Sequence, residues 1–172
     1  MVLLQADLAR ISRTRGGLAV LGLCFFVPYL AVEVGVVDLL GAVHLLSAFI
    51  ATDRLAGGLR LVSRSAPLRR AIGGTDHFLR WIHLGWPAVG ATLFVVLTSL
   101  SVGISLLTAL ISLLGALVVV YRTATRPPLD YASSAYDIGV LGPLPVGLVL
   151  QLLRGPAILM VLAAVQVGVS AG

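Results

Sequence analysis

Two long apolar runs constrain this chain more than any other feature of its sequence. Leu84–Tyr121 holds 38 residues without a charged side chain, and Gly16–Thr52 holds 37 residues with only Glu33 and Asp38. Charged residues make up 11% of the chain, whereas soluble domains average about 25%. A chain with so few polar groups cannot cover a water-facing surface. A soluble enzyme, a disordered chain and a coiled coil are therefore excluded, and an integral membrane protein built of helices is expected.

The length of these runs predicts how often the chain crosses the membrane. A helix rises about 1.5 Å per residue and the hydrocarbon core is about 30 Å thick, so about 20 residues make one span. Each run is long enough for two spans joined by a tight turn, the first near Gly35 and the second near 100–104. We therefore predict one membrane domain over 1–172, an all-α polytopic transmembrane helical bundle. Its five spans are expected at about 17–33, 36–53, 81–99, 104–121 and 156–171.

The segment before the last span allows three readings. Ile138–Leu153 is apolar, but it has only 16 residues and contains Pro143 and Pro145. It could form a short span, an interfacial lead-in, or a re-entrant half-helix. A full crossing would place Arg154 on the outer side, so the arginine count favours an interfacial or re-entrant half-helix at about 140–153.

The arginines predict the orientation. All 12 basic residues are arginines: three precede the first span, six lie in the loop 54–80, and two lie in the loop 122–137. The turns at the opposite ends of the spans have none. Because cytoplasmic loops carry the excess of basic residues, we expect a multi-pass protein of the cell membrane with a cytoplasmic, uncleaved N-terminus. The net charge of +5 then reflects topology and not nucleic-acid binding.

The loop 54–80 is predicted to contain two short helices. Apolar residues at i, i+4 and i+7 continue the second span as an amphipathic piece, weakened by Gly57-Gly58. A two-turn helix at 66–72 should follow, with Ser65 as its N-cap and Gly73 as its stop signal. The apolar residues of the first piece are Leu55, Leu59 and Val62.

The end of this loop leads into the third span. Thr75 should cap that helix, and Asp76 should pair with Arg80 at i,i+4. The loop has two interpretations: its arginines fix the topology against anionic lipid, or its short helix docks a soluble partner. The candidate docking residues are Arg64, Pro67, Arg69 and Arg70.

Polar groups within or beside the spans are candidates for function, because burying them in lipid is costly. His44 is the best placed, about two turns into the second span, either as a packing histidine or as a proton or substrate contact. Asp38 lies six residues away and so faces elsewhere on a helix. The candidate intramembrane polar residues are Glu33, Asp38, His44 and Arg154.

Small residues at every fourth position predict close helix packing around the fourth span. This spacing lets helix backbones approach closely, either within the chain or with a partner. Pro28 and Pro87 should kink the first and third spans. The candidate packing residues are Ser101, Ser105, Ala109, Ser112 and Ala116.

The motifs of enzymes are absent from the sequence. It has no H-E-x-x-H, no G-x-S-x-G, no cysteine–histidine cluster and no paired aspartates for a metal–diphosphate site. We therefore expect no catalytic, metal or cofactor site. The sequence also lacks G-x-x-x-x-G-K-[ST], so the chain has no P-loop with which to hydrolyse ATP.

Four segments resemble an uncharacterised family of bacterial multi-spanning proteins that are described as ABC-type exporter membrane components. They are ATDRLAGGLR at 51–60, SRSAPLRR at 63–70, TRPPLDY at 125–131, and GPLP with LLRGP within 142–156. Members are longer, so the chain is similar to a half-length member or to the C-terminal part of one. The resemblance implies a permease-like subunit with a separate cytoplasmic ATPase, for which the helix at 66–72 would be the coupling helix.

A second function also fits the residues. A non-transporting membrane scaffold or assembly factor would act by helix–helix packing, using the small-residue face of the fourth span. Either function implies the lipid bilayer as an environment, and homo- or hetero-oligomers with other membrane subunits as assemblies.

Overall fold

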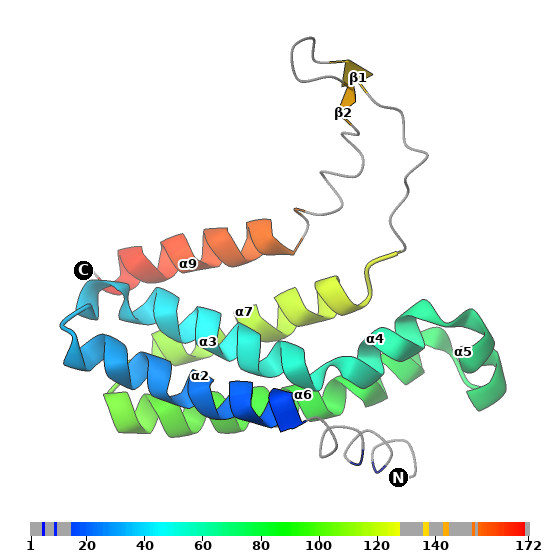
Figure 1. Ribbon diagram of the computed structural model, residues 1–172, viewed down its shortest axis with the longest axis horizontal. Helices are drawn as coiled ribbons and strands as arrows, with labels where there is room; N and C mark the ends of the chain where they lie inside the picture. Colours follow the sequence, from blue (N-terminus) through cyan, green and yellow to red (C-terminus); the bar gives the residue numbers. More distant parts are fainter. Residues whose placement is uncertain are drawn as a thin grey trace.

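The computed structural model describes residues 15–127, 136–137, 143–144 and 155–170, together with Gln5, Ala9 and Leu153 (Figure 1). Helices make up nearly all of these residues. In chain order the elements are α2 (Arg15–Glu33), η1 (Val37–Leu39), α3 (Leu40–Leu55), α4 (Gly57–Arg64), α5 (Ala66–Ile72), α6 (Asp76–Val102), α7 (Leu106–Ala124), β1 (Tyr136–Asp137), β2 (Pro143–Leu144) and α9 (Pro156–Ser170).

The helix α3 lies at the centre of the bundle, where it packs against α2, α6, α7 and α9. The α2–α3 and α6–α7 turns lie at one end of the long axis together with the end of α9 (Figure 1). We call this the turn end. At the opposite end, α4 and α5 project beyond the start of α2 (Figure 1). We call this the arginine end, because the short helices and the helix termini found there are rich in arginine. These residues are Arg54, Arg60, Arg64, Arg69, Arg70, Arg80, Arg122 and Arg126.

Glycines with positive φ make both turns at the turn end tight. Gly35 has a φ of 81° just after α2, and Gly103 has a φ of 72° just after α6. An L side chain disfavours this left-handed conformation, whereas glycine adopts it freely. The expected turns near Gly35 and 100–104 are confirmed, and Ser105 caps the next helix by accepting a 3.2 Å hydrogen bond from the Thr108 amide.

Two helices, α6 and α7, are long and apolar enough to cross a membrane. A third candidate is the pair formed by η1–α3 and α4, which bends by 59° at Ala56. The helices α2 and α9 also lie in the bundle, but their apolar stretches are shorter. The structure therefore supports a predominantly helical protein with two or three candidate spans, and five spans are not confirmed.

The core between these helices is made largely of small side chains. Its buried members include Ala48 and Ala51 of α3 and Ala116 of α7, with Phe94 of α6 as the large residue. Small residues let helix backbones approach closely, which increases their van der Waals contact. Gly115 of α7 lies at one such close approach, where a Cβ atom would lie 2.8 Å from Cδ1 of Leu162 and 3.1 Å from Cδ1 of Leu45.

The Thr75 cap expected for the third helix is confirmed: α6 begins at Asp76, and the Thr75 hydroxyl accepts from the Phe78 amide. Other sequence expectations need correction. Ser101 belongs to α6 and not to the fourth helix, because Gly103 ends α6 after it. The expected half-helix at 140–153 lies mostly outside the described residues, but Pro143–Leu144 within it pair antiparallel with Tyr136–Asp137.

We predict that Gly115→Leu destabilises the bundle. The new side chain would force α7 away from both α3 and α9, which should lower the free energy of unfolding by about 1–3 kcal/mol. Thermal unfolding of the detergent-purified protein measures this change. Gly168→Leu is the matched control, because a Cβ atom at Gly168 of α9 meets nothing within 4 Å, and equal losses in both variants would contradict the prediction.

Candidate functional site

His44 occupies the centre of the bundle, on the face of α3 that meets α6 and α7. Its side chain is fully buried, and so are those of Ser112 and Thr98 to within 2%. Nδ1 of His44 lies 2.9 Å from Oγ of Ser112 on α7, and Nε2 lies 2.8 Å from Oγ1 of Thr98 on α6. The imidazole ring therefore bridges three helices through side-chain hydrogen bonds.

Gln166 extends this polar cluster to a fourth helix, α9. Its Nε2 donates to Oγ of Ser112 at 3.0 Å and to the carbonyl oxygen of Thr108 at 2.9 Å. The side chain is completely buried. We call His44, Thr98, Ser112 and Gln166 the buried polar network.

One neutral state of the imidazole satisfies all of these hydrogen bonds. Gln166 donates to Ser112, so the Ser112 hydroxyl can donate its own proton to Nδ1 of His44. Nε2 of His44 then carries the ring proton and donates to Thr98, whose hydroxyl donates to the Phe94 carbonyl oxygen at 2.7 Å. This order gives each donor an acceptor and requires a neutral ring, because a protonated imidazole has two donors and no acceptor.

A serine within hydrogen-bond distance of a histidine is also the geometry of nucleophilic catalysis. Here Ser112 and His44 are both fully buried, so a substrate cannot reach the serine hydroxyl in this conformation. The other ring nitrogen bonds to Thr98 and not to a carboxylate. Within the described part of the chain there is also no group of three or more metal-ligating side chains. The burial of the pair, with each ring nitrogen bonded to a hydroxyl of another helix, suits a role in helix packing.

Glu33 and Asp38 do not join this network. Glu33 ends α2 and Asp38 lies in η1, and both are exposed at the turn end. Arg154 lies outside the described residues. Their exposure lets Glu33 and Asp38 remain solvated, so neither carries the cost of a buried charge.

Sequence reasoning missed Gln166, although one signal was present. It is the only strongly polar side chain in the otherwise apolar segment 156–169. An amide in such a segment needs a hydrogen-bond partner, because lipid offers none. The sequence could not show that its partners lie 54 and 58 residues away.

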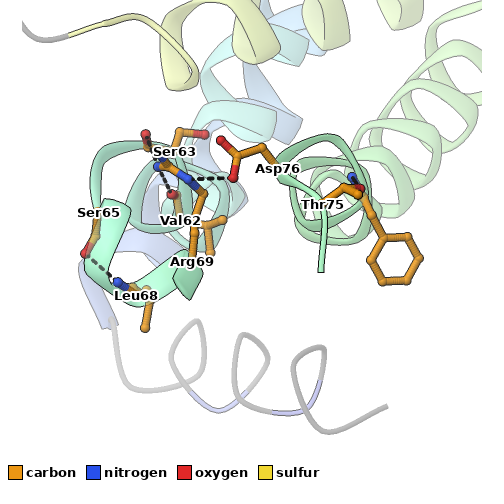
Figure 2. A network of polar contacts seen from close by, with 8 residues as sticks. Val62, Ser63, Ser65, Leu68, Arg69, Thr75 and Asp76 are labelled. Carbon is orange, nitrogen blue, oxygen red and sulfur yellow. Dashed lines mark hydrogen bonds and ion pairs between the residues drawn. The ribbon is translucent and has the colours of Figure 1, made fainter. Parts of the chain in front are cut away.

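At the arginine end, Arg69 of α5 holds three helices together (Figure 2). Its Nη1 donates to the carbonyl oxygens of Val62 and Ser63, both at 2.9 Å. These two carbonyls belong to the last turn of α4, which has no intrahelical partners for them. Nε of Arg69 also pairs with Oδ1 of Asp76 at 2.9 Å, which ties α5 to the start of α6. We call these contacts the Arg69 clamp.

The Arg69 clamp corrects one predicted contact and confirms several others. Asp76 pairs with Arg69 and not with Arg80, because the Gly73-Gly74 turn, with φ of 76° and 93°, folds α5 back beside the start of α6. The helix at 66–72 is confirmed, with Ser65 as its N-cap accepting from the Leu68 amide at 3.3 Å. The amphipathic continuation of the second span is also confirmed as α4.

The four candidate docking residues therefore lie in different surroundings. The side chain of Arg69 is 18% exposed and engaged in its clamp. The other three positions, Arg64, Pro67 and Arg70, are exposed. Arg69 builds the short helix into the fold, and the cations left for a partner are Arg64 and Arg70.

The candidate packing residues divide in the same way. Ala109, Ser112 and Ala116 are buried within the chain, facing the helices that α7 contacts. Ser101 and Ser105 are exposed near the turn end, where Ser101 bonds to the Leu97 carbonyl of its own helix at 2.8 Å. The small-residue face of α7 is thus used mostly inside the bundle.

We predict that Ser112→Ala destabilises the protein more than Ser101→Ala does. Loss of the Ser112 hydroxyl removes the acceptor of Gln166 and the donor to His44, which should lower the free energy of unfolding by about 1–2 kcal/mol. Ser101→Ala removes only an exposed intrahelical bond. Denaturant unfolding in a fixed detergent compares the two, and equal stabilities would show that the buried polar network contributes nothing.

We predict that Arg69→Gln loosens α5. Without the guanidinium, the last carbonyls of α4 and the Asp76 carboxylate lose their shared donor. Amide hydrogen exchange over 65–75 should become about tenfold faster, equivalent to about 1.4 kcal/mol of local stability. Arg70→Gln has the same charge change at an exposed position and should leave the exchange unchanged.

Comparison with known proteins places the chain in a family. The sequence profile of DUF6297, described as a family of unknown function, matches residues 1–134 of the 172. The match includes the Arg69 clamp and the network residues of α3, α6 and α7, and it ends before Gln166. No curated protein and no solved structure matches the chain. The match gives no support to the exporter description that the resemblance implied. Because the profile matches most of the sequence, the chain belongs to the DUF6297 family.

Proposed function

We propose that this protein is a permease-like membrane subunit of an exporter whose ATPase is a separate chain. The observation that carries the proposal is the helix α5, which the Arg69 clamp ties to α4 and α6 at the arginine end while Pro67 and Arg70 stay exposed. A short, preorganised helix of this kind suits docking, because little conformational entropy is lost when a partner binds.

The proposal includes five membrane crossings with a cytoplasmic N-terminus. The helix α2 has 19 residues, about 28 Å at 1.5 Å per residue, and α9 packs lengthwise on α3. Both helices turn large apolar side chains outward, as a lipid-facing surface requires. Among these side chains are Leu23, Phe26 and Leu30 of α2, and Met160, Val161 and Val165 of α9.

The distribution of charge supports the orientation. The described connections at the turn end carry the acids Glu33 and Asp38 and no arginine, whereas the loop that contains α4 and α5 is rich in arginine. The positive-inside rule then places the arginine end in the cytoplasm. This is the side from which an ATPase would approach α5.

The need for a separate ATPase follows from the sequence. The chain has no P-loop motif, so it has no recognisable means to couple ATP hydrolysis to movement by itself. An exporter subunit would receive that energy through a cytoplasmic contact. The segments 51–60 and 63–70, which resemble exporter components, lie on α3, α4 and α5, and this supports the proposed contact.

The alternative of a membrane scaffold receives less support from the geometry. Its expected interface was the small-residue face of α7, but Ala109, Ser112 and Ala116 are already buried against helices of the same chain. A scaffold would therefore need a different surface. Co-purification with a membrane partner and no ATPase would favour this alternative.

We predict that Arg70→Glu weakens ATPase docking. Reversing this exposed charge on α5 should lower the affinity for the ATPase subunit about tenfold, because a like-charge contact would replace an attractive one. Co-purification in mild detergent followed by titration of the ATPase measures the change. Arg54→Glu is the matched control, since Arg54 is exposed near the same end but belongs to α3.

The result that would overturn the docking role is equally specific. Wild-type protein that never retains a P-loop ATPase in mild detergent would remove the partner. Equal binding by the wild type and the Arg70→Glu variant would show that α5 is not the contact.

A further inference from the structure

A cavity of about 350 Å³ lies on the outward face of α4, apart from the buried polar network and the Arg69 clamp. It is lined by Gly57, Arg60, Leu61, Arg64 and Ser65. The first four are spaced i, i+3, i+4 and i+7, so they share one face of the helix. The opposite face carries the buried residues Leu59 and Val62, which attach α4 to the bundle.

The charge of this cavity corresponds to one uncompensated cation. Arg60 forms an ion pair with Asp53 through one Nη atom, and its guanidinium has further N–H groups that can donate to an anion. The exposed guanidinium of Arg64 makes no hydrogen bond or ion pair among the described residues. The site therefore offers several N–H donors. The charges of Arg60, Arg64 and Asp53 sum to +1, which matches a ligand with one negative charge.

Aromatic residues beside α4 indicate the level at which this helix would lie in a bilayer. Leu59 of α4 packs with Leu84 and Ala124, and Tyr121 packs against this cluster. Tyr121 also stacks on the exposed ring of Trp81, with centroids 6.2 Å apart. Tyrosine and tryptophan gather at the headgroup level of a bilayer, so α4 lies at that level.

The helix α4 changes direction at the bend after α3, departing by 59° from the direction of that helix. Leu61 stays 49% exposed between the two arginines. An exposed leucine beside guanidinium groups matches a ligand that has both an anionic and an apolar part.

We propose that this cavity binds the phosphodiester headgroup of an anionic phospholipid with one net negative charge, such as phosphatidylglycerol. Arg64 and the remaining donors of Arg60 hold the phosphate oxygens, and the acyl chain begins over Leu61. The volume lies at the small end of the roughly 300–1,000 Å³ range of ligand pockets, which suits a headgroup. Free phosphate has no apolar part to cover Leu61. The bound lipid would hold α4 at its angle, whatever partner docks on α5.

The test compares two arginine variants of the full chain. Native mass spectrometry measures how much phosphatidylglycerol the protein retains from detergent micelles that contain equal amounts of phosphatidylglycerol and phosphatidylcholine. Arg64→Gln should lower the apparent affinity for phosphatidylglycerol at least about fivefold. Arg70→Gln, an equal charge change at an exposed position outside the cavity, should lower it less than about twofold. Leu61→Ser should also weaken retention, since it removes the apolar contact.

Each other outcome overturns the proposal. Equal losses in Arg64→Gln and Arg70→Gln would mean that the loop attracts anionic lipid only diffusely. Displacement of the lipid by excess inorganic phosphate, with no effect of Leu61→Ser, would make the cavity a site for soluble phosphate. If the protein retained as much phosphatidylcholine as phosphatidylglycerol, the cavity would not discriminate between lipids by their net charge. The thermal stability of each variant, expected to equal that of the wild type, keeps these results separate from misfolding.

Discussion

Helices that are surrounded by hydrocarbon gain little from burying one apolar side chain against another, because lipid is equally apolar. Their association must come from close packing and from hydrogen bonds between helices. In this protein both requirements meet on α3. Its alanines allow close contact with neighbouring helices, and His44 connects it to Ser112 and Thr98 by side-chain bonds. The rest of the bundle is arranged around that helix.

The buried polar network also explains why a polar histidine is tolerated in the core. Each ring nitrogen has a partner, and the amide of Gln166 orients the Ser112 hydroxyl so that the ring can stay neutral. A half-satisfied network would be worse than an apolar core, because each unmet group keeps its cost of desolvation. The burial of the Ser112–His44 pair leaves it without access for a substrate in this conformation.

The two ends of the bundle differ in complexity. At the turn end, helices reverse through short glycine turns. At the arginine end, the bend at Ala56 and the Gly73-Gly74 turn fold α4 and α5 into a compact unit beside α6. Arginines that look alike in the sequence thereby acquire different surroundings: Arg69 is internal, Arg64 lines the cavity on α4, and Arg70 is exposed on α5. This division is what lets one short loop serve both a lipid and a protein partner in our proposals.

The sequence by itself determined the helical membrane architecture and the local signals within the loop 54–80. Length and the lack of charge predict the helices, and Ser65, Gly73 and Thr75 act on backbone groups only a few residues away. Only the tertiary structure decided which polar groups meet. His44 and Ser112 are 68 residues apart, and the partners of Gln166 are on another helix. Even the nearer Arg69–Asp76 pair depends on how an intervening turn folds. A residue pattern records the spacing along one helix, whereas contacts between helices depend on how each helix is rotated and packed against the others.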